Sequence, residues 1–139
     1  MNVLTQLSGE HEQVRAHLER IEAAAEAHDD QALRAALLAA KAALTDELDA
    51  HIALEEGEAF PAIAEALGEG LVVPFREEHR EVRMLRDTAL AALTLGRAPH
   101  VAALRLCELI LDHQQREDHM LFPSALEAVP AGRLDGSEK

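Results

Sequence analysis

The chain has 139 residues, which is enough for one domain with a single buried core. Its formal charge of −13, from 26 acidic and 13 basic side chains, argues against nucleic acid and anionic membranes as partners. We expect a cytoplasmic protein, because no stretch of about 18 apolar residues could cross a bilayer and the N-terminus lacks a signal-peptide pattern.

The first half of the chain predicts two helices. Ala and Leu dominate its apolar residues, which favours an all-α fold. Asn2 is a good N-cap for the first helix, and Asp29 or Asp30 can cap the second, which runs to the glycines near 68. Apolar residues of the first helix recur at steps of three and four, and His11 interrupts their stripe.

The second half predicts two more helices. Pro74 and Pro99 suit the first turns of the third and fourth helices, where a missing N–H costs nothing. His79 interrupts the apolar stripe of the third helix. Long helices joined by short turns predict an up-down-up-down antiparallel four-helix bundle. We expect residues 1–130 to form the domain and 131–139 a flexible tail.

Two eleven-residue stretches repeat each other. HIALEEGEAFP, from His51, and HQQREDHMLFP, from His113, agree at the histidine, at a carboxylate four residues later and at a Phe-Pro pair. The sequence EHEQVR at 10–15 likewise matches EHREVR at 78–83. The bundle is therefore expected to be built from two repeated helical hairpins that pack about an approximate twofold axis.

The repeated residues have the chemistry of metal ligands. A histidine and a glutamate four residues apart lie on one helix face, and imidazole with carboxylate suits iron, manganese or zinc. A glutamate can bridge two ions with its two oxygens, so the duplicated set predicts a dinuclear site with two histidines and two bridging oxygens per metal. The candidate ligands are His11, His51, Glu55, His79, His113 and Glu117.

Neighbouring charged residues are weaker candidates. Glu10 and Glu78 precede ligand histidines, where they either orient the site or form solvated ion pairs. Glu56 and Asp118 point about 100° from the ligand face and are expected to be solvated. Glu58 lies on the ligand stripe, as a supporting group or an alternative ligand. Four histidines without partners in the repeat are expected on the surface or in loops: His17, His28, His100 and His119.

The EEHREVRML segment around His79 and the two HxxxE…FP helices resemble the hemerythrin family, specifically the HHE cation-binding domains of bacteria. The resemblance spans residues 3–128. It implies a four-helix bundle with a non-haem di-iron (Fe2+/Fe3+) site, bridged by two carboxylates and in some states by an oxo or hydroxo group, with the same six ligands. Oxygen-carrying hemerythrins have a fifth histidine at the position of Phe75. We therefore expect a poor oxygen carrier whose two irons are nearly equivalent and both accessible.

Three kinds of function fit these residues. The first is a binding or sensing module for oxygen, nitric oxide or iron itself. The second is a di-iron enzyme that decomposes hydrogen peroxide, like a catalase or peroxidase. The third is a helical adaptor that binds zinc for stability. The absence of Tyr and Trp removes radical relays and phenolic donors, which favours binding over catalysis. Small molecules are the expected partners, and the sequence does not define an oligomeric state.

Overall fold

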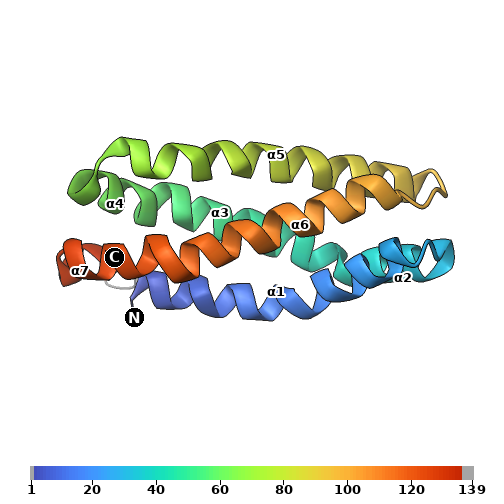
Figure 1. Cartoon of the computed structure of the whole chain (residues 1–139), viewed down its shortest axis with the longest axis horizontal. Coiled ribbons are helices and arrows are strands. Elements are labelled where there is room, and N and C mark those ends of the chain that lie inside the picture. Colours follow the sequence, from blue (N-terminus) through green and yellow to red (C-terminus); the bar gives the residue numbers. More distant parts are fainter. Residues whose placement is uncertain (1, 136–139) are drawn as a thin grey trace.

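A computed structural model describes residues 2–135 and shows an antiparallel four-helix bundle (Figure 1). Two of the four helices contain π-helical turns, η1 and η2 in the second helix and η3 in the fourth, without a break in the chain's helical path. The all-α fold class predicted from the sequence is confirmed. The helices are α1 (Val3–Glu26), the run of α2 (Asp30–Ala42), η1 (Ala43–Glu47), α3 (Leu48–Leu54), η2 (Glu55–Ala59) and α4 (Phe60–Leu67), then α5 (Glu69–Thr94), and the run of α6 (His100–Arg116), η3 (Glu117–Leu121) and α7 (Phe122–Ala128).

Side-chain caps begin the first two helices as the sequence predicts. The Asn2 side chain accepts a hydrogen bond from the Leu4 N–H at 2.7 Å, and the Asp29 side chain accepts one from the Ala32 N–H at 3.0 Å. Each bond satisfies a backbone donor that has no partner inside its helix. These caps set where α1 and α2 begin.

The start of α5 differs from the prediction. The helix begins at Glu69, directly after Gly68, so Pro74 lies inside it instead of in its first turn. Gly68 has a φ of 102°, a conformation that glycine adopts without strain, and this lets the chain reverse within one residue. The reversal is therefore tighter than the proline suggested. Pro99 lies at the N-cap of α6, one residue before the helix.

A π-helical turn begins at each glutamate of the repeated motif. The N–H of Phe60 donates to the carbonyl of Glu55, and the N–H of Phe122 donates to that of Glu117, each five residues back. A proline follows each phenylalanine and has no N–H, so an ordinary α-helical bond cannot form there. The wider turn keeps the helix continuous past the proline.

The hydrophobic core consists of two clusters with a polar layer between them. One cluster fills the end of the bundle near the α1–α2 and α5–α6 turns, around Leu18, Leu37 and Leu106. The other fills the end near the chain termini, around Leu7 and Phe60. Each buried large apolar side chain contributes roughly 1.5–3 kcal/mol. The two clusters hold the four helices firmly on both sides of the polar layer. Across the described chain, no helix is both long and apolar enough to span a membrane.

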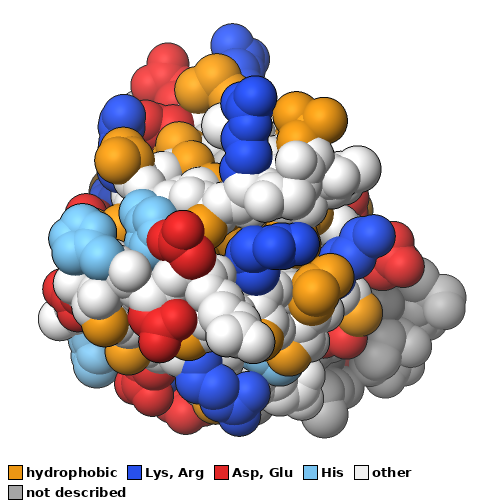
Figure 2. Space-filling view, turned by 90° about the vertical axis from the view of Figure 1, so that its right-hand side faces the viewer, with side chains coloured by type: hydrophobic (Ala, Val, Ile, Leu, Met, Phe, Trp, Pro, Cys, Tyr) orange, Lys and Arg blue, Asp and Glu red, His pale blue; other side chains and the backbone are white. Residues whose placement is uncertain are grey.

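The turn end of the bundle carries two of the histidines expected on the surface or in loops. The rings of His28 and His100 lie 5.6 Å apart, and His100 Nε2 is 2.5 Å from a carboxylate oxygen of Asp30. Figure 2 views this end and shows histidine side chains beside acidic ones. This cluster belongs to neither group of candidate metal ligands among the described residues.

Part of the expected tail, residues 131–134, has regular structure. Residues Ala131–Leu134 form a 3-10 turn, labelled η4, and Leu134 is buried in the cluster near the termini. An apolar side chain two turns beyond the helix end can reach this cluster, so it packs there instead of fraying. Residues 136–139 lie outside the described part of the chain.

Candidate metal centre

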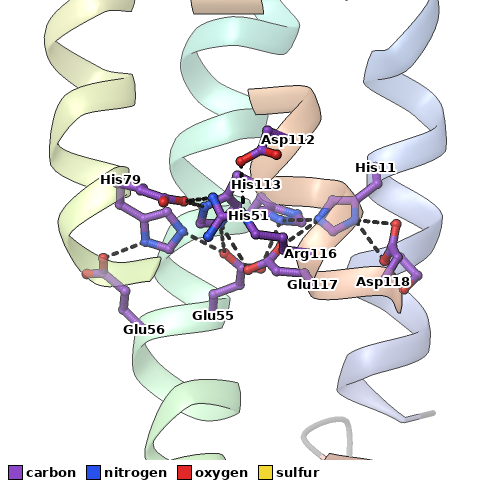
Figure 3. Close-up of polar contacts among 12 residues, drawn as sticks. His11, His51, Glu55, Glu56, His79, Asp112, His113, Arg116, Glu117 and Asp118 are labelled. Atoms are coloured by element: carbon purple, nitrogen blue, oxygen red, sulfur yellow. Dashed lines mark hydrogen bonds and ion pairs between the residues drawn. The ribbon is translucent and has the colours of Figure 1, made fainter. Parts of the chain in front are cut away.

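The six predicted ligand residues come together in the polar layer between the two core clusters (Figure 3). Each of the four helices of the bundle contributes at least one of them, and all six side chains point into the bundle. They form two overlapping groups whose ligand atoms lie within 4.8 Å of one another. The groups are His11, His51, Glu55 and Glu117, and Glu55, His79, His113 and Glu117.

The two groups share the buried carboxylates of Glu55 and Glu117. Glu55 Oε1 lies 2.8 Å from His79 Nε2, and its Oε2 lies 3.4 Å from His51 Nε2. Glu117 Oε2 lies 3.0 Å from His113 Nε2, and its Oε1 lies 3.1 Å from His11 Nε2. Each carboxylate therefore spans both groups with one oxygen toward each, which is the placement of a bridging ligand.

An outer carboxylate accepts a hydrogen bond from the Nδ1–H of each of the four histidines of the centre. Because a carboxylate only accepts, it fixes a proton on Nδ1 and turns the Nε2 of each ring toward the centre, where Nε2 can bind a cation once it is deprotonated. The four Nδ1 atoms lie 2.7 to 3.0 Å from their partners. The pairs are His11 with Asp118, His51 with Glu10, His79 with Glu56, and His113 with Glu78.

This outer layer corrects one expectation from the sequence. Glu56 and Asp118 were expected to be solvated, yet each accepts a hydrogen bond from a histidine of the other hairpin. The helix that carries each of these carboxylates packs beside a helix of the other hairpin. A side chain that points away from the ligand face of its own helix therefore meets the outer edge of a histidine on that neighbouring helix. The periodicity of a single helix does not predict which helix will pack beside it. Glu10 and Glu78 take the orienting role.

Aromatic rings fix the planes of the imidazoles. Phe60 stacks on His79 with ring centroids 5.5 Å apart, and Phe122 stacks on His11 at 6.1 Å. Each phenylalanine therefore stacks on a histidine of the other hairpin, as the approximate twofold axis requires. Phe75, at the position of the missing fifth histidine, packs its edge against His113 at 5.2 Å. These rings keep water from the termini side of the centre.

The buried charges shift one another's protonation. Burial lowers the pKa of His51, but its contacts with the carboxylates, Glu55 first, outweigh burial and raise this pKa to about 9. Burial likewise lowers the pKa of His113, while Glu117 and then Glu55 raise it to about 10. Burial raises the pKa of Glu55, yet hydrogen bonds from histidines, that of His113 first, hold it well below its usual range. Burial and the charge of Glu55 raise the pKa of Glu117. Binding of a cation must therefore displace protons from this layer.

The donor set fits a metal ion in each group. His11 Nε2 and His51 Nε2 are 3.2 Å apart. Two imidazoles that bind one ion at about 2.1 Å stand roughly 3.0–3.4 Å apart. Glu55 Oε2 and Glu117 Oε1 are buried without a hydrogen-bond partner among the described residues, which is costly unless a cation satisfies them. The ring centroids of His11 and His51 are 4.9 Å apart, and those of His79 and His113 are 5.0 Å apart, so the two pairs have matching geometry.

The centre has a first end, with His11 and His51, and a second end, with His79 and His113. The two ends differ in access. A cavity of about 470 Å³ opens between α1 and η1–α3 and is lined by His11 and His51, but by neither His79 nor His113. The sequence led us to expect two equally accessible ends, whereas this cavity reaches only the end with His11 and His51. At the second end, Arg116 lies over Phe75, so a ring and a guanidinium cover the imidazoles there.

The remaining charged residues stay outside the centre. Glu58, a possible alternative ligand by sequence, belongs to neither ligand group, and neither does His17 or His119. Arg116 is a contributor that the sequence did not suggest, because it donates to Glu78 at 2.6 Å and so ties down the carboxylate that orients His113. The only sequence signal for it was its place one turn after His113.

Fold and site together define a helical-bundle protein with a buried histidine–carboxylate centre suited to metal cations. The family model described as the hemerythrin HHE cation binding domain matches residues 2–125. The chain therefore belongs to the hemerythrin HHE family, and the resemblance seen in its motifs is confirmed. Searches of curated proteins and of solved structures gave no match.

Proposed function

We propose that the chain holds two iron ions and uses the pair to bind or sense a small molecule such as oxygen or nitric oxide. Glu55 and Glu117 would bridge the ions, and each ion would take one of the two histidine pairs. The observation that carries this proposal is the orientation of the imidazoles. All four Nδ1 atoms are tied to outer carboxylates, so the four Nε2 atoms face the two buried carboxylates and can bind a cation once they are deprotonated.

An iron pair in this place would supply reversible electron exchange and coordination positions for a small ligand. The chain's own residues prepare the site for it. The outer carboxylates hold the imidazoles in the metal-binding tautomer, and the stacked phenylalanines Phe60 and Phe122 exclude water. With four protein ligands per ion, each ion keeps room for a further ligand when it prefers five or six. A centre of this kind reacts with small molecules, which favours iron chemistry over a purely structural zinc site.

The test is the iron content of the purified chain. Protein from iron-rich medium should contain two irons per chain, and Glu117→Ala should lose most of both because this carboxylate serves both groups. His17→Ala is the matched control, since His17 lies on α1 outside both groups and should keep the full content. Equal iron loss in the two variants, or a wild-type content near zero, would contradict the proposal.

A further inference from the structure

The repeat allows each lining residue of the large cavity to be compared with its counterpart at the other end. Ala50 and Leu54 line the cavity, and their counterparts, 62 residues later, are Asp112 and Arg116. Arg116 donates to the Asp112 carboxylate at 2.9 Å and to that of Glu78 at 2.6 Å. Small and apolar residues at the first end are thus replaced by a network of ion pairs at the second.

A second ion pair covers the same side of the second end. Gln13 lines the cavity, and its counterpart, 68 residues later, is Glu81. Glu81 pairs with Arg105 of α6 at 3.7 Å. At the first end the helix opposite α1 widens into the π-helical turn η1, which contributes Ala43 to the cavity wall. The open end is therefore a consequence of both smaller residues and a wider helical turn.

Gln114 stands where the large cavity meets the centre. A second cavity, of about 20 Å³, is lined by the four histidines and Glu55, and Gln114 lines both cavities. Gln114 is only 5% exposed, and its Oε1 has no hydrogen-bond partner among the described residues. Its counterpart at the other end is Ile52, which is apolar. An unpaired buried acceptor costs free energy that a hydrogen-bond donor in the cavity would recover.

We propose that Gln114 is a specificity-determining residue, which accepts a hydrogen bond from a ligand that enters by the cavity beside His11 and His51. This inference rests on the proposed metal centre. The described lining includes the acidic residues Glu10 and Glu47 and neither Lys nor Arg, which disfavours anions. The cavity therefore favours small neutral molecules: oxygen and nitric oxide can enter by it without this hydrogen bond, and a molecule with an N–H or O–H group also gains the bond to Gln114. The inner cavity has room for about one water-sized group, since about 10–15 Å³ of such space holds a single water, so only a small group of the ligand would reach the proposed ions.

The access route is tested with a pair of matched tryptophan variants. Ala50→Trp fills the cavity, and Asp112→Trp places the same side chain at the equivalent position of the covered end; both positions are exposed. The probe is imidazole at about pH 8, where it is neutral, titrated into iron-loaded protein and followed by absorbance. Ala50→Trp should raise the Kd for imidazole at least about tenfold, and Asp112→Trp less than about twofold. Equal effects of the two variants would overturn the access route.

The role of Gln114 is tested with a ligand that lacks the donor. Gln114→Met keeps the shape of the side chain and removes its amide. This variant should raise the Kd for imidazole about three- to tenfold, the effect of one lost hydrogen bond, and leave that of 1-methylimidazole unchanged. Equal weakening of both ligands, or of neither, would overturn the hydrogen bond. Iron is counted in every sample first, so a chain without two irons refutes the metal centre, whereas normal iron with unaltered binding refutes only the present inference.

Discussion

The two ends of the metal centre are alike in their inner residues and different in their outer ones. Around the shared carboxylates, the two histidine pairs have ring separations of 4.9 and 5.0 Å and similar tilts of 47° and 45°. Outside them, one end opens into a cavity of about 470 Å³, and the other is covered by Arg116 and its carboxylate partners. Under the proposed function, the like inner residues would let each end hold a metal ion, and the different outer residues would let ligands enter only beside His11 and His51.

Removing the metal should have the largest effect, because it tests the likeness of the inner residues. The two proposed ions would share Glu55 and Glu117, so a chelator should remove them together in one step. Metal at about 1,000 times its Kd stabilises by about 4 kcal/mol, which for a chain of this size lowers Tm by roughly 10–20 °C on removal. Calorimetry during titration with a chelator checks both points. Two separate losses of iron would show that the ends are independent.

Changes in the outer carboxylates should have a smaller effect that differs between the ends. Asp118→Asn and Glu56→Gln remove equivalent acceptors, and losses of about 10- to 100-fold in metal affinity are typical for such groups. Asp118 also accepts from Ser8 Oγ at 2.7 Å and is 20% exposed, against 34% for Glu56. We therefore expect the larger loss for Asp118→Asn, measured by competition with a coloured chelator. A larger loss for Glu56→Gln would mean that the support from Ser8 is unimportant.

The smallest expected effect is a pH dependence of the metal-free protein. The pKa values of His51 and His113 are raised to about 9 and about 10, above the usual value near 6.5. Their stabilising contribution is therefore complete below about pH 6.5 and is lost as pH rises through 9 and 10. Tm of chelator-treated protein should fall by a few degrees between about pH 7 and pH 10, and the histidine at the open end should lose its proton first. An unchanged or higher Tm at about pH 10, together with unshifted histidine NMR titrations, would contradict these pKa directions.

Most of the fold was predictable because the signals for it are local. The caps at Asn2 and Asp29 and the break at Gly68 follow from backbone chemistry within a few residues. Pro74 misled the prediction because a proline fits several positions near a helix start, and the tighter turn at Gly68 decided between them. The π-helical turns were not predicted, since the proline that prevents the ordinary bond indicates only that the helix is perturbed.

The part of the candidate site that recurs in both halves of the chain was predictable from the sequence. Repetition pointed to the inner six residues, because duplicated hairpins bring equivalent positions to one axis. The roles of Glu56 and Asp118 depend on which helix lies next to them, and helix periodicity does not contain that information. The inequality of the ends depends on positions where the repeat differs, such as Leu54 and Arg116, and those differences acquire meaning only when the side chains are placed.

Anomalous diffraction at the iron absorption edge, from crystals of iron-loaded protein soaked in imidazole, tests the central claim most directly. We predict two iron peaks, one beside His11 and His51 and one beside His79 and His113, with Glu55 and Glu117 between them. We also predict imidazole only at the first, against Gln114. A single iron peak, iron away from these residues, or imidazole at the end covered by Arg116 would contradict the account.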